Sequence, residues 1–139
     1  MKKIISSLLI CLVFTACNQK IEDTDIAKIN GYWEIEKAVM PDGSSKEYSI
    51  NPTIDYFEIK NNKGFRKKVM PQLDGTYLVS ELDEKVAVIK QDDHVYLKYT
   101  TAYAKWKEEL VKVTDEELVL KNEHDMEYHY KKATSFSIK

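Results

Sequence analysis

The stretch Ile29-Asn30-Gly31-Tyr32-Trp33 decides how the rest of this sequence is interpreted. Gly31 has no Cβ and lets two chain segments pass close together, which is useful where a first strand begins. Trp33 is one of two tryptophans, and an indole buries roughly 150 to 250 Å² when it lies in a core. Residues 26–29 can form a single helical turn just before it, so we predict a short turn that leads into a first strand.

The sequence after Asn30 consists of short runs rich in Tyr, Val, Ile and Phe that are separated by turn residues at roughly even spacing. Val95, Leu97 and Tyr99 alternate with polar residues, so they share one face of a strand. The pattern is typical of an all-β barrel or sandwich. Because consecutive antiparallel hairpins with half-buried faces can close on themselves, we predict an up-and-down antiparallel β-barrel of eight to nine strands with a short N-terminal helical turn. The predicted strands are residues 32–39, 53–60, 65–70, 76–82, 85–91, 94–100, 103–113, 117–121 and 126–132, and a long polar connection runs from Met40 to Pro52.

Two local assignments are less direct than the strand series. Thr24 or Asp25 is placed to cap the helical turn through a side-chain oxygen. Residues 104–111 have the propensity of a helical turn but fit a strand in the series, and we interpret them as a strand. Whether Trp106 in this strand lines the interior stays open.

Residues 1–17 have the organisation of a secretory signal. Lys2 and Lys3 are followed by an apolar run over residues 4–14, and Phe14-Thr15-Ala16 precedes Cys17. The run is short of the ~20 residues needed to span a bilayer. The stretch resembles the lipobox of bacterial lipoproteins. That resemblance implies a signal peptide over residues 1–16 and a lipid on Cys17. The polar composition after the cysteine predicts a tether, so that the lipidated Cys17 and the tether cover residues 17–25, and the strand series assigns the barrel domain to residues 26–139.

The resemblance also implies a location and a partner. A lipidated Cys17 would hold the protein at a membrane of the cell envelope, since two or more acyl chains anchor stably. Asn18, rather than an aspartate, follows the cysteine. By analogy with the sorting signal of enteric bacteria this favours the outer membrane of a Gram-negative bacterium.

Charge and cysteine content exclude several classes of function. The net charge is -2, which becomes -4 without Lys2 and Lys3, so we expect no nucleic-acid partner. Cys11 leaves with the signal and Cys17 carries the lipid, so the mature domain has no disulfide. No nucleophile motif or phosphate-binding loop is present, and we expect neither a cofactor nor catalysis.

The residues around Trp33 resemble the Gly-x-Trp signature of lipocalins, here Gly31-Tyr32-Trp33 after a short helical turn. With the order of the later turns, the chain is similar over residues 26–132 to small bacterial lipocalin-like lipoproteins. In that family Gly31 and Trp33 would form the barrel floor. No arginine ends the last strand to stack on the tryptophan, and Lys131 or Lys132 is the available substitute.

A lipocalin-like barrel implies a small hydrophobic ligand. We predict that inward-facing aromatic and aliphatic side chains line its site, namely Phe57, Ile59, Val88, Leu97, Tyr99, Tyr128 and Tyr130. The alternative is a filled barrel that serves as an envelope scaffold, whose loops, such as Met40 to Pro52, bind a protein partner. The sequence does not decide between a hollow and a filled interior.

Three other groups of residues favour structural roles. His94, His124 and His129 lack the convergent spacing of a metal site, so we expect no metal. The pairs Glu108-Glu109 and Glu116-Glu117 point to opposite faces of a strand, and we expect them on the solvated surface. The basic cluster Lys63, Arg66, Lys67 and Lys68 fits a charged edge strand better than a contact with anionic lipid.

Overall fold

The computed structural model describes residues 20–48, 54–72, 77–79 and 83–133, which include a short helical segment and ten strands. The elements are α1 (Asp23–Ile26), η1 (Ala27–Ile29), β1 (Gly31–Val39), β2 (Ser45–Glu47), β3 (Ile54–Lys60), β4 (Lys63–Pro71), β5 (Tyr77–Val79), β6 (Glu84–Gln91), β7 (His94–Thr100), β8 (Lys105–Val113), β9 (Glu117–Lys121) and β10 (Glu127–Lys132). Cys17 and the predicted signal lie outside the described residues. No helix in the described ranges has the length and hydropathy needed to cross a bilayer.

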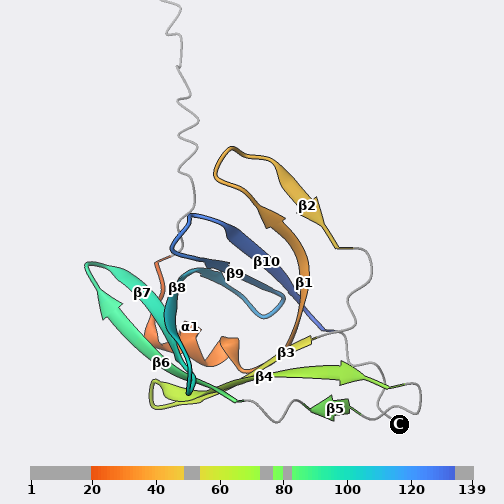
Figure 1. Cartoon of the computed structure of the whole chain (residues 1–139). Helices are drawn as coiled ribbons and strands as arrows, with labels where there is room; N and C mark the ends of the chain where they lie inside the picture. Colours follow the sequence, from red (N-terminus) through yellow and green to blue (C-terminus); the bar gives the residue numbers. More distant parts are fainter. Residues whose placement is uncertain (1–19, 49–53, 73–76, 80–82, 134–139) are drawn as a thin grey trace, which may run out of the picture.

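Eight strands form a closed antiparallel ring in chain order. The ring runs β1, β3, β4, β6, β7, β8, β9 and β10, and β10 returns to pair with β1. The first and last strands therefore lie side by side, as Figure 1 shows for β1 in orange and β10 in blue. Trp33 pairs with Lys132 and Ile35 with Tyr130 in this closing ladder. The predicted up-and-down barrel is confirmed.

Two tight turns fix the register of the hairpins. Asn61 and Asn62 connect β3 to β4, Asp92 and Asp93 connect β6 to β7, and all four residues have positive φ. Two-residue turns of this kind match the twist of the flanking strands. Directly after the first turn, a Cβ built on Gly64 would lie 1.7 Å from the carbonyl oxygen of Glu58, so only glycine fits there.

Two strands lie outside the ring. β2 pairs with β1 inside the segment expected to be a polar connection, because the chain folds back after Met40. β5, within the predicted run 76–82, pairs with the end of β4. β4 also pairs with β3 on one side and β6 on the other. The interpretation of residues 63–68 as part of an edge strand is therefore wrong.

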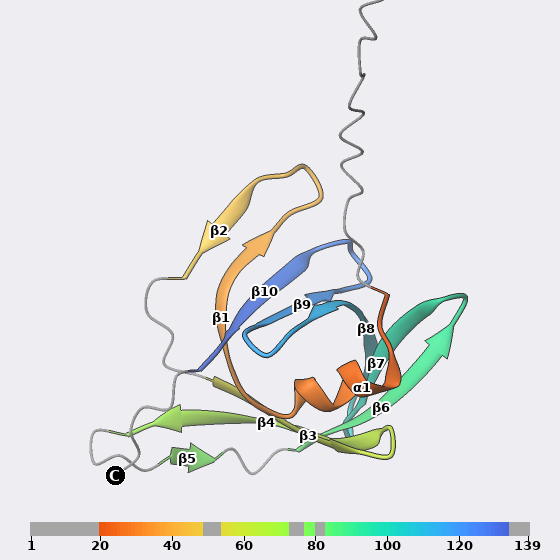
Figure 2. The ribbon, with the colours of Figure 1, turned by 180° about the vertical axis from the view of Figure 1, so that it is seen from behind.

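The helical segment closes one end of the barrel. Ile26 and Ile29 are buried in the main hydrophobic core, and Figure 2 shows α1 lying across the ring of strands. The helix begins earlier than expected. Its N-cap is Glu22 rather than Thr24 or Asp25, because Asp25 lies within the turn and its carboxylate accepts the Glu22 N–H at 2.9 Å.

Trp33 lies at this closed end, beside the helical segment. The ring is fully buried, and its Nε1–H donates a hydrogen bond of 2.7 Å to the carbonyl oxygen of Ile29. Lys132 Nζ lies 4.5 Å from the centre of the indole and donates to the carbonyl oxygen of Asn30 at 2.8 Å. Lys132 rather than Lys131 thus occupies the position of the missing arginine. Burial lowers the pKa of Lys132, and these two contacts offset part of its desolvation.

The strand directions place the remaining connections at two ends. The turns at 61–62, 92–93 and 114–116 lie at the closed end, whereas segments 101–104 and 122–126 lie at the opposite end, called here the loop end. The closing ladder and the hydrophobic core are made by residues 21–132. The barrel domain therefore closes and packs through its own contacts.

Candidate functional site: the barrel interior

The seven side chains predicted to line a ligand site all belong to one interior cluster. Phe57, Leu97 and Tyr99 have no exposed surface, and Ile59 and Tyr130 are less than a tenth exposed. Val88 and Tyr128 are partly buried against the same core. The tertiary fold brings these residues together from β3, β6, β7 and β10. Their role toward a ligand stays a prediction.

Trp106 belongs to the same interior, which answers the question that the sequence left open. It lies on β8 opposite Tyr99 of β7, and the two rings stack at 5.4 Å with an interplanar angle of 24°. Trp106 is half-buried and lies next to the loop end, because β8 begins one residue before it. The predicted strand at 104–111 is confirmed as part of β8.

A charged group of side chains is buried above the apolar floor. We call Arg66, Glu84 and Glu108 the Arg66 cluster. Arg66 forms a short two-nitrogen ion pair with Glu84, and its Nη1 lies 3.4 Å from Glu108 Oε1. The guanidinium also lies 4.2 Å from the centre of the Tyr99 ring. The Arg66 guanidinium is therefore surrounded by two carboxylates and one aromatic ring.

A second ion pair lies beside the Arg66 cluster. Lys68 Nζ donates to Asp55 Oδ1 at 2.7 Å, and the two residues are direct neighbours across β3 and β4. The Asp55 side chain is only 7% exposed, whereas Lys68 is 53% exposed and reaches toward solvent. The interior thus contains three carboxylates near one buried guanidinium.

Burial and neighbouring charges shift the acid–base properties of this region. Burial alone would lower the pKa of Arg66, but Tyr99 and the carboxylates of Asp55, Glu84 and Glu108 raise it overall. Burial raises the pKa of Glu108, and its contact with Arg66 only partly opposes this rise. The geometry gives the reason, because Glu84 takes the closer contact with Arg66 and leaves Glu108 the longer one.

Two tyrosine hydroxyls complete the polar part of the interior. The Tyr99 hydroxyl is buried and interacts with the Glu108 carboxylate, although no hydrogen bond within 3.5 Å is formed among the described residues. Burial, together with the charge of Glu108, raises the pKa of Tyr99. Burial and Asp55 do the same for the pKa of Tyr130. Both phenols stay protonated and can donate a hydrogen bond to a polar group.

This charged interior was not predicted from the sequence. Glu108 was expected on the solvated surface, and that expectation is wrong, because β8 turns Glu108 inward and leaves Glu109 outside. Arg66 was grouped with surface lysines, although it is the only arginine in a chain with 20 lysines. A guanidinium keeps its charge when buried and can contact two carboxylates, which an ammonium does less well. A single arginine among 20 lysines was therefore a feature of the sequence from which a buried ion pair could have been predicted.

The histidines do not form a common site. His94 Nδ1 lies 3.2 Å from Glu109 Oε2, and His129 Nε2 lies 3.5 Å from Glu127 Oε1. His124 is in the turn between β9 and β10. Within the described ranges no three metal-ligating side chains converge. The expectation of a protein without a metal stays a prediction.

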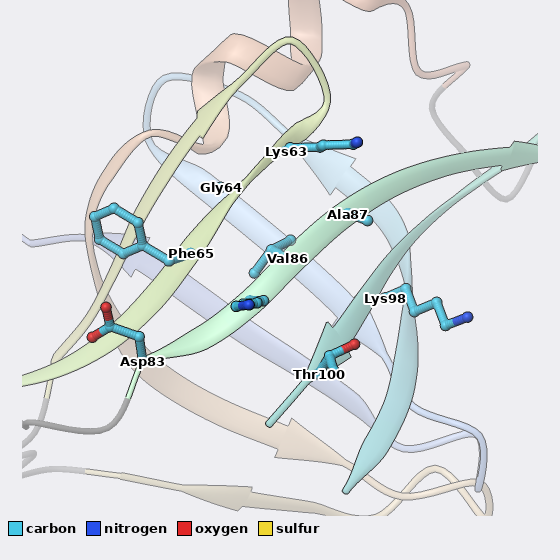
Figure 3. Close-up of a pocket in the computed structure, with 9 residues that line it drawn as sticks. Lys63, Gly64, Phe65, Asp83, Val86, Ala87, Lys98 and Thr100 are labelled. Carbon is cyan, nitrogen blue, oxygen red and sulfur yellow. The ribbon is translucent and has the colours of Figure 1, made fainter. Parts of the chain in front are cut away.

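The outer surface of the barrel carries a separate groove of about 520 Å³ over β4, β6 and β7. Its walls include Lys63, Phe65, Lys85, Ala87, Lys98 and Thr100. Figure 3 shows Lys63 and Lys98 on either side of Ala87, with Phe65 at the far edge of the groove. This groove shares no side chain with the seven predicted lining residues.

The fold and its interior define an up-and-down β-barrel with one end sealed by a helix and a buried tryptophan. An eight-stranded barrel of this size is wide enough for packed side chains or for one small ligand. The chain belongs to the lipocalin-like domain family, which matches residues 29–120. This confirms the resemblance seen in the sequence.

The solved structures to which the chain is similar are distant in sequence. A lipocalin-like protein from Bacteroides uniformis has 10% identity and a TM-score of 0.47, covering 76% of this chain and 98% of that protein. An uncharacterized protein from Bacteroides eggerthii has 12% identity and a TM-score of 0.46, with coverages of 74% and 98%. Apocrustacyanin C1 has 8% identity and a TM-score of 0.49, with coverages of 81% and 64%. No curated relative matches the chain.

Proposed function

We propose that this protein is a non-catalytic, lipid-anchored binding protein that holds a small hydrophobic ligand in its barrel. The carrying observation is the convergence of seven aromatic and aliphatic side chains on one interior, next to the buried Tyr99 hydroxyl and the Glu108 carboxylate. Apolar walls with a few polar groups are typical of small-molecule sites. Membership of the lipocalin-like family supports the same function.

The interior suggests how such a ligand is oriented. Apolar side chains surround Trp33 near the closed end, whereas Arg66 and Glu108 lie farther toward the loop end. An amphipathic ligand would place its apolar part toward Trp33 and a hydrogen-bonding group toward Tyr99. Tyr99 can donate to that group, since its phenol is protonated.

The test combines a search for a natural ligand with a filled-barrel variant. Native mass spectrometry after mild purification is expected to show a co-purifying small molecule. A neutral fluorescent probe such as Nile red is expected to bind the wild type but not Val88→Trp, whose indole points inward. Ile89→Trp, on the outer face of the same strand, is the matched control and is expected to bind. Absence of both a guest and probe binding to the wild type would overturn this function.

The anchor forms the second part of the proposal. Cys17 is proposed to carry the lipid, and Asn18 to direct the protein to the outer membrane of a Gram-negative cell. Mass spectrometry of the N-terminal peptide is expected to show acyl chains on Cys17. Cys17→Ala is expected to release the protein from membranes, and Asn18→Asp to move it to the inner membrane. An unmodified Cys17 in membrane-extracted protein would contradict anchoring.

One observation favours a different function. The zero exposure of Phe57, Leu97 and Tyr99 is typical of a close-packed interior, which a scaffold would have. In that case segment 40–52, part of which forms β2, would bind a protein partner in the envelope. Crosslinking from positions in β2 is the test of the scaffold function. Recovery of one specific protein, together with no guest in the barrel, would select the scaffold.

A further inference from the structure

The outer face of four adjacent strands carries two rows of side chains dominated by lysine. Direct pairing aligns Lys63, Ala87, Lys98 and Lys107 in one row across β4, β6, β7 and β8. The neighbouring row is Phe65, Lys85, Thr100 and Lys105. Five of these eight positions are lysine and none is acidic. We call Lys63, Lys85, Lys98, Lys105 and Lys107 the lysine face.

No carboxylate within the described residues forms an ion pair with the lysine face, although Asp83 and Glu123 lie at its edges. All five lysines are exposed, and none forms an ion pair with another described residue. Lys98 and Lys107 are direct cross-strand neighbours, an arrangement that destabilises a sheet. In the next row, Glu109 of β8 lies directly opposite Lys121 of β9, so opposite charges face each other there. An anionic partner outside the chain would relieve this repulsion between like charges.

The surface between these lysines is hollowed and apolar. The groove of about 520 Å³ lies between Lys63 and Lys98, and Phe65 and Ala87 form part of its wall. A second groove of about 320 Å³ lies on the other side of Lys98, next to Trp106. Four strands spaced by about 4.8 Å give the rows a width of roughly 15 Å. This surface is broad enough to contact several lipid headgroups together.

The N-terminal segment meets β6, β7 and β8 near their closed-end residues, beside the lysine rows. Lys20 and Ile21 line a pocket with His94 of β7 and Glu109 of β8. Asp23 then forms a short ion pair with Lys90 of β6. Two residues separate Cys17 from Lys20, so the Cα atoms of Cys17 and Lys20 are at most about 11 Å apart. An anchor at Cys17 would hold β6, β7 and β8 close to the membrane, and this step rests on the anchoring proposed above.

We propose that the lysine face is a membrane-contact surface that binds the anionic phosphate headgroups of phospholipids. Lysine ammonium groups bind phosphates as compact point charges. The lipid anchor and the lysine face then act as two linked contacts, so the barrel lies with β4, β6, β7 and β8 against the bilayer. Two signals of this kind anchor more firmly than either does alone.

The experiment uses residues 18–139, which contain the self-contained barrel but not Cys17. Sedimentation is measured with vesicles of phosphatidylcholine alone and with vesicles that also contain phosphatidylglycerol. The test variant carries Lys85→Gln, Lys98→Gln and Lys107→Gln. The control variant carries Lys46→Gln, Lys121→Gln and Lys131→Gln, which cause the same change in net charge away from the lysine face. Thermal unfolding of all three proteins checks that each is folded.

The proposal predicts binding to phosphatidylglycerol vesicles at low salt and its loss at high salt. Each lysine near an anionic surface contributes about fivefold, so the test variant is expected to bind roughly 100-fold more weakly. The control variant is expected to keep most of the binding. Equal loss in both variants would attribute binding to net charge and overturn the proposal. So would binding to phosphatidylcholine alone, or release from vesicles by millimolar inorganic phosphate at constant ionic strength.

These outcomes are separate from those of the proposed function. The protein without Cys17 tests headgroup contact, whereas modification of Cys17 tests anchoring. The lysine face can fail while the barrel binds its ligand, because no side chain of the lysine face belongs to the predicted interior site.

Discussion

Lys132 lies with its Nζ 4.5 Å from the centre of the Trp33 ring and donates to the Asn30 carbonyl oxygen at 2.8 Å. The contact joins the first and last strands at the point where the ring closes. The Asn30 side chain forms two hydrogen bonds with the Ile59 backbone nearby. Asn30 Nδ2 donates to the Ile59 carbonyl oxygen at 3.1 Å, and the Ile59 N–H donates to Asn30 Oδ1 at 2.6 Å. One end of the barrel is thus held by contacts between β1, β3 and β10.

Loss of the Lys132 contact is expected to weaken the fold. Lys132→Ala removes a cation above an aromatic ring and a donor to a carbonyl, and should lower the free energy of unfolding by about 1 to 2 kcal/mol. Lys132→Arg should retain stability, because a planar guanidinium stacks on the indole. Urea unfolding measures both changes. Lys131→Ala, on the exposed side of the strand, is the control and should change stability little.

Trp33→Phe tests the seal itself. The substitution leaves the Ile29 carbonyl oxygen without its donor and removes part of a fully buried side chain. The expected loss is about 2 to 4 kcal/mol of unfolding free energy. Trp106→Phe, in a half-buried position, is expected to cost less. An equal loss from both variants in urea unfolding would contradict the role assigned to Trp33.

Substitution of Arg66 should be more damaging than substitution of any exposed lysine. Arg66→Met leaves Glu84 and Glu108 without their cation in a buried site, and a loss of about 3 to 5 kcal/mol is expected. Adding Glu108→Gln to that variant should restore part of the stability, because one uncompensated charge is removed. The midpoints of urea unfolding measure this gain in stability. If Glu108→Gln does not stabilise the Arg66→Met variant, then Arg66 and Glu108 do not contribute to stability as a pair.

The stability of the protein should depend on pH through Glu108. Burial raises the pKa of Glu108 in the folded state above the value of 4.5 for an unperturbed glutamate. The folded protein therefore binds a proton that the unfolded chain has released, and this contribution to stability is lost as the pH rises through the folded pKa. Relative to Glu108→Gln, the wild type should lose unfolding free energy from about pH 4 upward. A constant difference across this range would contradict the raised pKa.

Gly43 and Gly64 are required for different reasons, the first for its positive φ and the second because another backbone segment lies too close for a side chain. Gly43 has a φ of 89° and open space around its Cα, so Gly43→Ala should cost about 1 kcal/mol from conformation alone. Gly64→Ala would place a methyl group against the backbone of Glu58 and should prevent formation of the β3–β4 hairpin. Circular dichroism of both variants measures the outcome. A folded Gly64→Ala protein would show that the hairpin can shift.

Local sequence patterns were sufficient for the strands and for the closed end. Alternation in β7 and the residues around Trp33 predicted the barrel, because strand periodicity and turn chemistry act over a few residues. The paired turn Asn61-Asn62 could also have predicted the charged interior. It places Arg66 opposite Phe57 and Lys68 opposite Asp55, so a correct register sets Arg66 on the face of a predicted core residue.

The sequence by itself determined a series of short antiparallel strands joined by tight turns, since these features depend on neighbours along the chain, and the resemblance to lipocalins added the expectation of a closed barrel with Trp33 at one end. Only the tertiary structure decided that Arg66 meets both Glu84 and Glu108, and that lysines from four strands form one surface. Both arrangements depend on the stagger between strands distant in sequence. That stagger is set by packing and closure of the whole ring, because periodicity within a strand specifies which residues share a face but not which residues of another strand lie opposite them.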